Sequence, residues 1–116
     1  TRHLINRETI AKMKPTACLI NTSRGGVVDE KALIWALQER LLAGACLDVL
    51  DPEPPQRGNP LLAMPQVILT PHVAWYSEES QDELRKNIAQ DIGRVLKGLF
   101  PKGLVNKKLA DQFSAA

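Results

Sequence analysis

Three short, continuously apolar segments constrain the fold of this chain more than any other feature of its sequence. They span residues 17–21, 45–50 and 67–70, and each is followed directly by a polar loop. Continuous rather than alternating apolarity predicts strands that are buried on both faces, as in a parallel sheet. Parallel neighbours need a crossover, and residues 30–42 supply an amphipathic helix that Asp29 is placed to cap. The sequence therefore predicts an α/β fold.

Two further helices are predicted, one before and one after these segments in the sequence. Asn6 is placed to cap a short helix to about Met13, and a long helix runs from Ser77 to about Lys97. The apolar stripe of the long helix consists of Leu84, Ile88, Ile92, Val95 and Leu99. No Gly-x-Gly-x-x-Gly motif occurs in the sequence. The expected fold is the carboxyl-terminal half of a doubly wound (Rossmann-like) parallel sheet, plus a long C-terminal helix.

Composition excludes several classes of protein. The net charge of +2 comes from mixed signs along the chain, which gives no basic stripe for nucleic acid. The apolar stretches are too short to span a bilayer and Thr1-Arg2-His3 opens no signal-peptide pattern, so we expect no membrane partner and a cytoplasmic setting. Cys18 and Cys46 lack metal-ligand spacing and are expected to be buried, reduced thiols, and no metal site is predicted.

Three polar residues, Arg24, Glu53 and His72, follow the three predicted strands. The carboxyl ends of parallel strands lie at one edge of a sheet, where ligands of doubly wound folds bind. Arg24 can form two hydrogen bonds to a carboxylate, and His72 can exchange a proton near neutral pH. Glu53 can hold one tautomer of the imidazole and stabilise its protonated form. The alternatives are an arginine in a surface turn, a packed histidine and a solvated glutamate.

Two further positions carry open interpretations. Asp48 ends a buried strand, where an ionised carboxylate needs a partner, and a helix N-terminus or an arginine can supply it. Trp75 and Tyr76 follow His72 closely and can either belong to a core or line a cleft.

Three local strings carry a family resemblance. They are Leu19-Ile20-Asn21-Thr22-Ser23-Arg24-Gly25-Gly26, Leu47-Asp48-Val49-Leu50-Asp51-Pro52-Glu53-Pro54 and Leu69-Thr70-Pro71-His72. In this order they closely resemble the NAD-dependent D-2-hydroxyacid dehydrogenase family, over about residues 1–106. That family includes D-lactate, glycerate/hydroxypyruvate and 3-phosphoglycerate dehydrogenases and the corepressors called C-terminal-binding proteins. The string from His72 to Glu78 is similar to the C-terminal-binding proteins and to related dehydrogenases.

The resemblance implies roles for these residues. Arg24 would bind the substrate, His72 would donate the proton and Glu53 would support His72. The positions implied for cofactor binding are Thr22, Ser23, Arg24, Asp48, His72 and Ala74. Trp75 would wall the substrate cleft. The expected cofactor is NAD, and NADP is not excluded, because the residue that reads the ribose lies in the other half of such a domain.

The resemblance also implies a domain organisation. Residues 1–76 would be part of an NAD-binding domain, and residues 77–116 a helix and tail that return to a substrate domain in a longer protein. The expected function is part of an oxidoreductase acting on a small 2-keto or 2-hydroxy acid, with a homodimer as its assembly. The alternatives are an NAD-sensing, corepressor-like scaffold of the same fold and an inactive truncation.

Overall fold

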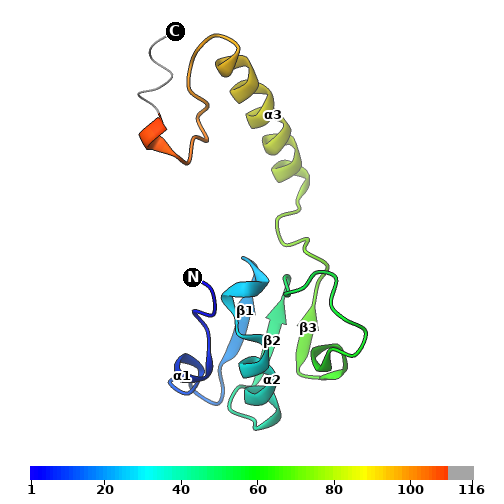
Figure 1. Cartoon of the computed structure of the whole chain (residues 1–116). Helices are drawn as coiled ribbons and strands as arrows, with labels where there is room; N and C mark the ends of the chain where they lie inside the picture. Colours follow the sequence, from blue (N-terminus) through cyan, green and yellow to red (C-terminus); the bar gives the residue numbers. More distant parts are fainter. Residues whose placement is uncertain (110–116) are drawn as a thin grey trace. The chain divides into compact units, whose positions relative to one another are not determined.

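The computed structural model describes residues 1–109. The chain forms two compact units, and the boundary between them in the sequence falls between Ala74 and Trp75. That boundary lies two residues before the one expected from the sequence. In chain order the elements are α1 (Arg7–Ile10), β1 (Cys18–Asn21), η1 (Gly25–Val27), α2 (Glu30–Gln38), β2 (Gly44–Leu47), η2 (Pro60–Ala63), β3 (Val67–Leu69), α3 (Glu78–Val95) and η3 (Lys107–Leu109) (Figure 1). Each unit is described by itself below.

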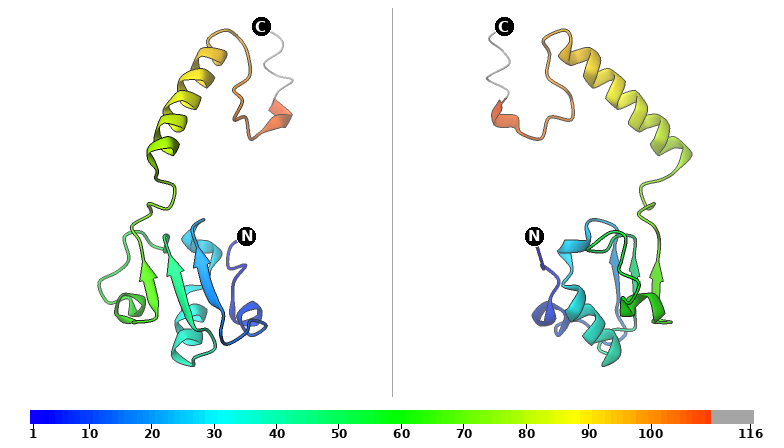
Figure 2. Two further views of the ribbon diagram at one scale, coloured as in Figure 1. Left: turned by 180° about the vertical axis from the view of Figure 1, so that it is seen from behind. Right: turned by 45° about the vertical axis from the view of Figure 1, so that its right-hand side comes forward.

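The first unit is built on a parallel sheet of three strands in the order β1-β2-β3. Cys18 pairs with Gly44 at one end of the first ladder, and Leu47 pairs with Leu69 at the far end of the second. α2 connects β1 to β2 and lies against one face of the sheet (Figure 2). The parallel α/β architecture is confirmed, and all three strands end at the same edge.

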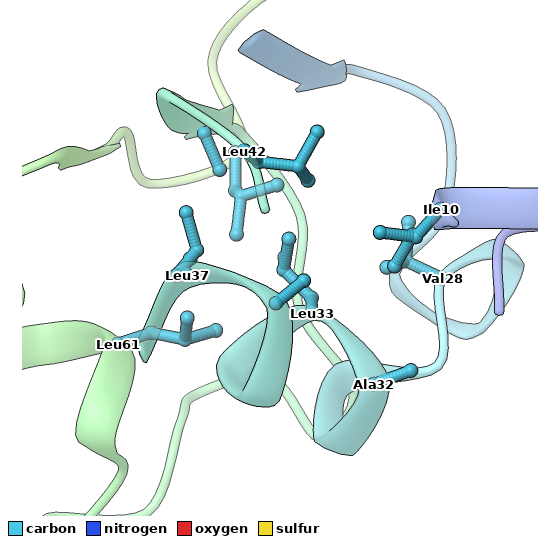
Figure 3. Packing of buried hydrophobic residues seen from close by; sticks show 10 residues of the cluster. Ile10, Val28, Ala32, Leu33, Leu37, Leu42 and Leu61 are labelled. Atoms are coloured by element: carbon cyan, nitrogen blue, oxygen red, sulfur yellow. The ribbon is translucent and has the colours of Figure 1, made fainter. Parts of the chain in front are cut away.

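The core lies between α2 and the sheet. It consists of Ile10, Val28, Ala32, Leu33, Ala36, Leu37, Leu42, Ala45, Leu47 and Leu61 (Figure 3). Ala32, Leu33, Ala36 and Leu37 recur at helical spacing, which gives α2 one continuous apolar face. Burial of this face holds α2 against the sheet.

The two early helices begin where predicted but end sooner. Asn6 caps α1 by accepting from the backbone N–H groups of Glu8 and Thr9, yet the helix stops at Ile10 instead of Met13. Similarly, α2 stops at Gln38 instead of about Leu42, because Arg40 has a left-handed backbone (φ 56°). The turn returns the chain to the core at Leu42.

The prediction that the strands are buried on both faces is wrong for this chain. The side chains of Ile20 and Ile68 point away from α2 and are 68% and 63% exposed. Cys18 and Cys46 lie on the same face of the sheet as these two isoleucines. Cys18 is exposed and Cys46 half-buried, so the expectation of two buried thiols is also wrong, although both are free. The apolar sequence meets a covering layer on one face only, and the other face is open in the described residues.

The second unit contains α3. Ser77 caps it in a reciprocal pair with Ser80, and the backbone of Gly98 is left-handed (φ 69°) just beyond its last turn. No residue of α3 is buried, and the five residues of the predicted stripe are each about half exposed. Asp91 accepts from the N–H groups of Lys102 and Gly103, which holds the following segment against the helix. No helix among residues 1–109 combines the length and apolarity needed to cross a membrane.

Replacing a core leucine should cost far more stability than replacing an isoleucine on the open face. Leu33 is 1% exposed, so Leu33→Ala should lower the free energy of unfolding by about 2–5 kcal/mol. Ile20→Ala, the matched control, should lower it by less than about 1 kcal/mol, because exposed side chains contribute little. Urea unfolding at low protein concentration measures both. Equal losses would show that the open face is covered in solution.

Candidate active site

The structure brings the loops after β2 and β3 into direct contact through Glu53 and His72. The Nδ1 atom of His72 lies 2.9 Å from Oε2 of Glu53, and both side chains are partly exposed. The other carboxylate oxygen, Oε1, accepts from the backbone N–H of Leu50 at 3.0 Å. Glu53 therefore joins the histidine to the end of β2, and the ring is oriented by a carboxylate that is itself anchored.

The hydrogen bond from His72, followed by that from Leu50, lowers the pKa of Glu53, and a weaker contribution comes from the charge of Arg24. The carboxylate is thus kept ionised and able to accept from the imidazole. The stability that this ionisation contributes is present above the ordinary pKa of 4.5 and is lost as the pH falls through the lowered, folded value.

Arg24 lies at the end of the first loop, with an exposed side chain. Its guanidinium donates from Nη1 to the carbonyl of Ser23 at 2.7 Å. It acts electrostatically on Glu53 but does not line the hollow beside the histidine. Arg24, Glu53 and His72 thus gather at one edge, as predicted from the strand order; their roles in catalysis stay predictions.

A buried asparagine that sequence reasoning did not select shapes the Arg24 loop. Asn21 accepts from the N–H and the hydroxyl of Ser23, and it donates from Nδ2 to the carbonyl of Arg24 at 3.0 Å. Side-chain to backbone bonds of this kind are typical of asparagine at turns. An Asn at the end of a strand, followed two residues later by Ser, is the signal that could have identified it.

Gly25 lets the first loop approach the second. A Cβ atom built on Gly25 would collide with the backbone carbonyl of Leu50 and would lie 2.6 Å from the N atom of Asp51. Only glycine fits against this backbone without displacing the chain. The contact sets the separation between the Arg24 loop and the segment that leads to Glu53.

Asp48 is 5% exposed and is satisfied within the chain. Its Oδ1 accepts from the Thr70 hydroxyl at 2.5 Å and from the Val73 N–H at 2.9 Å, and Oδ2 accepts from the Ala74 N–H at 2.9 Å. Burial alone would raise the pKa of Asp48, but these hydrogen bonds outweigh burial and lower it. The partner left open by the sequence is therefore the loop that carries His72.

A hollow of about 220 Å³ lies beside the histidine–glutamate pair. It is lined by Asp48, Leu50, Glu53, Pro54, Pro55, Thr70, Pro71 and His72. Proline and leucine supply apolar walls, and the polar atoms come from the residues that hold or form the pair. Such a small, partly apolar hollow suits a small molecule better than an extended ligand.

The other predicted cofactor positions lie at the same edge. Thr22 and Ser23 are exposed in the first loop, and Ala74 follows His72 with its N–H on Asp48. Trp75 begins the second unit and packs edge-to-face on Tyr76. Its place in a substrate cleft stays a prediction. Among residues 1–109, no group of three or more His, Cys, Asp or Glu side chains is arranged to hold a metal ion.

Comparison with known families identifies one match, over residues 1–74. Its description is "D-isomer specific 2-hydroxyacid dehydrogenase, NAD binding domain". The matched segment is the whole first unit, and it contains Arg24, Glu53 and His72.

Individual proteins agree with this match. A glyoxylate reductase of Thermofilum pendens is 47% identical over 109 residues, which are 94% of this chain and 32% of that protein. A D-isomer specific 2-hydroxyacid dehydrogenase of Xanthobacter autotrophicus Py2, solved with NADPH and MES, superposes with a TM-score of 0.82 at 38% identity, covering 95% of this chain and 45% of that one. A D-lactate dehydrogenase of Lactobacillus jensenii, solved with NAD⁺, has a TM-score of 0.77 at 31% identity, covering 91% and 36%. The chain spans about a third of the length of the curated glyoxylate reductase.

Replacing the histidine should raise the pKa of its glutamate partner. His72→Asn removes the hydrogen bond that lowers the pKa of Glu53 most, so that pKa should rise toward 4.5. Asparagine suits the left-handed backbone of His72 (φ 57°), which limits strain. An NMR titration of the Glu53 carboxyl carbon measures the shift.

His3→Asn is the matched control, because His3 is the other histidine and also has a left-handed backbone (φ 51°). It should leave the pKa of Glu53 unchanged. An unchanged titration in His72→Asn would show that the two side chains do not interact in solution.

Proposed function

The chain belongs to the D-isomer-specific 2-hydroxyacid dehydrogenase family, and on that premise we propose that it is the catalytic part of an oxidoreductase. The enzyme would transfer a hydride between a nicotinamide dinucleotide and a small 2-keto or 2-hydroxy acid. The observation that carries this proposal is the 2.9 Å contact between His72 Nδ1 and Glu53 Oε2 at the carboxyl edge of the sheet. The proposed proton donor His72, its partner Glu53 and the guanidinium of Arg24 all follow the carboxyl ends of the strands.

The proposed roles follow from the chemistry of each side chain. His72 would give a proton from Nε2 to the keto oxygen during reduction and take it back during oxidation. Glu53 would accept a hydrogen bond from Nδ1–H of His72, so that Nε2 points away from Glu53. The carboxylate would also stabilise the protonated imidazole. Arg24 would bind the substrate carboxylate through two parallel hydrogen bonds and polarise the keto oxygen.

The residues at this edge fit the nicotinamide end of the cofactor. A carboxylate has about four acceptor positions, and Asp48 uses three of them within the chain, which leaves one for a carboxamide N–H. Thr22, Ser23 and the backbone near Ala74 would lie along the same ring. The bound cofactor supplies the hydride. One solved relative was determined with NAD⁺ and another with NADPH.

We further propose that the chain acts within a longer polypeptide. Residues 1–76 would be one half of the NAD-binding domain, and residues 77–116 would lead toward a substrate domain. Three features support this: the open sheet face, the unpaired outer edge of β1 among the described residues, and a matched glyoxylate reductase about three times as long as the chain. An NAD-sensing scaffold would need no proton-transfer pair, so the His72–Glu53 contact favours catalysis over that alternative. A cytoplasmic location stays a prediction from the sequence.

Replacing Arg24 in the full-length enzyme tests the proposed activity. Arg24→Ala should lower kcat/KM for keto acids by at least about 10²-fold, equivalent to about 2.7 kcal/mol of transition-state stabilisation. Arg24→Lys should recover only part, because lysine cannot form the two parallel bonds. Steady-state kinetics with pyruvate, glyoxylate and hydroxypyruvate measure both.

Arg57→Ala is the control, since Arg57 is an exposed arginine elsewhere in the first unit. Its kinetics should match the wild type. Wild-type kinetics in Arg24→Ala would show that Arg24 does not belong to the active site. A wild-type enzyme that binds NADH but turns over no keto acid would favour the NAD-sensing scaffold.

We propose that the protein is a homodimer and that the apolar stripe of α3 takes part in its contacts. Leu84, Ile88, Ile92 and Val95 recur at helical spacing on α3 and are each about half exposed, so they form an apolar stripe that a second copy of the chain could cover. Ile88→Glu should therefore weaken self-association of the chain. Lys86→Glu introduces the same side chain off the stripe and should not.

Light scattering over a range of concentrations compares these variants with the wild type. We expect the wild type and Lys86→Glu to associate as concentration rises, and Ile88→Glu to stay smaller. A wild-type chain that remains monomeric throughout would contradict the proposal.

A further inference from the structure

We propose that Asp48 is a positioning residue that holds the His72 loop in its active shape before any cofactor binds. This inference rests on the proposed function, because it assigns to Asp48 the placement of the proposed proton donor. It differs from a role in cofactor binding, since all of the contacts that carry it lie within the chain.

The backbone of His72 requires such support. Its φ of 57° lies in the left-handed region, which side chains with a Cβ occupy only at a cost. The N–H of His72 donates to the carbonyls of Asp48 and Thr70, both at 3.0 Å. The residue is therefore tied to the end of β2 through its own backbone.

The next two residues complete the loop around the carboxylate. The N–H groups of Val73 and Ala74, which follow His72 in the chain, donate to the Asp48 oxygens at 2.9 Å each. The hydroxyl of Thr70, which precedes His72 in the chain, donates to Oδ1 of the same carboxylate. Successive N–H groups that converge in this way form a small concave site for an anion. Asp48 is the anion that occupies it.

The placement has a direct consequence for the proton-transfer pair. His72 is bounded on one side by Thr70 and on the other by Val73 and Ala74, and all three donate to Asp48. A carboxylate on β2 therefore sets where the imidazole leaves the backbone, and the second carboxylate, Glu53, sets how the ring turns. The two contacts differ in kind, because Asp48 is bonded to the backbone and hydroxyl groups of the loop and Glu53 is bonded to the imidazole ring.

Asp48→Asn is the informative substitution. The amide retains one oxygen acceptor but presents N–H donors where backbone N–H groups already point, so at least one of the three contacts must break. The first measurement uses the 116-residue chain without cofactor. In the wild type, the amide protons of Val73 and Ala74 should shift together as Asp48 ionises, and in Asp48→Asn this shared titration should be absent.

The variant should also disturb the pair itself. If His72 is displaced, the Glu53 carboxyl should titrate at a higher pH in Asp48→Asn than in the wild type. Asp51→Asn is the matched control, because Asp51 is an exposed aspartate in the same segment and forms an ion pair of 3.6 Å with Arg2. It should leave the titration of Glu53 and both amide signals unchanged.

Thr70→Val keeps the shape of the side chain and removes one of the three donors, so it serves if Asp48→Asn does not fold. It should move the Glu53 titration in the same direction by a smaller amount. Unchanged Val73 and Ala74 signals across the ionisation of Asp48, or an unchanged Glu53 titration in both variants, would overturn the proposal.

Kinetics of the full-length enzyme separate this inference from the proposed function. Asp48→Asn should lower kcat by at least about tenfold, since misplacing a reacting group by about 1 Å can cost about 10²-fold. If the Val73 and Ala74 amide signals follow Asp48 as expected but the Arg24 variants keep full activity, the role of Asp48 is supported and the proposed dehydrogenase function is rejected. If the Arg24 variants lose activity but the Val73 and Ala74 amide signals do not respond to Asp48, the proposed function is supported and the role of Asp48 is rejected.

Discussion

The burial of one ionised carboxylate at the end of β2 organises the edge of this sheet. Asp48 is nearly inaccessible, and such a group is tolerated only if its hydrogen bonds replace water. The chain meets that requirement with a hydroxyl and two backbone N–H groups from the segment after β3. The same bonds force the histidine between them into a left-handed backbone. The electrostatic need of one residue thus determines the geometry of another.

The two carboxylates at this edge differ because their surroundings differ. Asp48 is nearly buried and accepts from the Thr70 hydroxyl and two backbone N–H groups, so it holds a loop and keeps only one acceptor position for a ligand. Glu53 is partly exposed in a proline-rich loop and faces the imidazole, so it can respond to the charge on the ring. Gly25 allows the Arg24 loop to approach the segment before Glu53. The three loops are therefore held by contacts with one another.

Two apolar surfaces, the open sheet face and the α3 stripe, are exposed in the described residues. Both are as apolar as the core, and neither is covered in the described residues. Burying such surface contributes roughly 25 cal/mol per Å², so both surfaces favour a partner layer. The matched glyoxylate reductase is about three times as long as the chain, which is consistent with the layer over the open sheet face lying elsewhere in a larger protein.

Much of the fold and the positions of the site residues were predictable, because they depend on periodicity and order along the chain. Three apolar runs and one helical repeat predicted the parallel sheet, and parallel strands must end at one edge, where Arg24, Glu53 and His72 lie. The helix ends at Ile10 and Gln38 were not predictable, since the turns after them depend on packing. The open face was predicted wrongly, because an apolar run does not reveal whether a second layer is present.

The sequence by itself determined that a guanidinium, a carboxylate and an imidazole follow consecutive strands, since this is a matter of residue order. It also showed that Asp48 needs a partner, because a buried charge is costly whatever surrounds it. Only the tertiary structure decided that the partner is the His72 loop, and that Asn21 and Gly25 shape the Arg24 loop. Hydrogen bonds between loops 22 or more residues apart depend on the register of the strands, and register is settled only when the core packs.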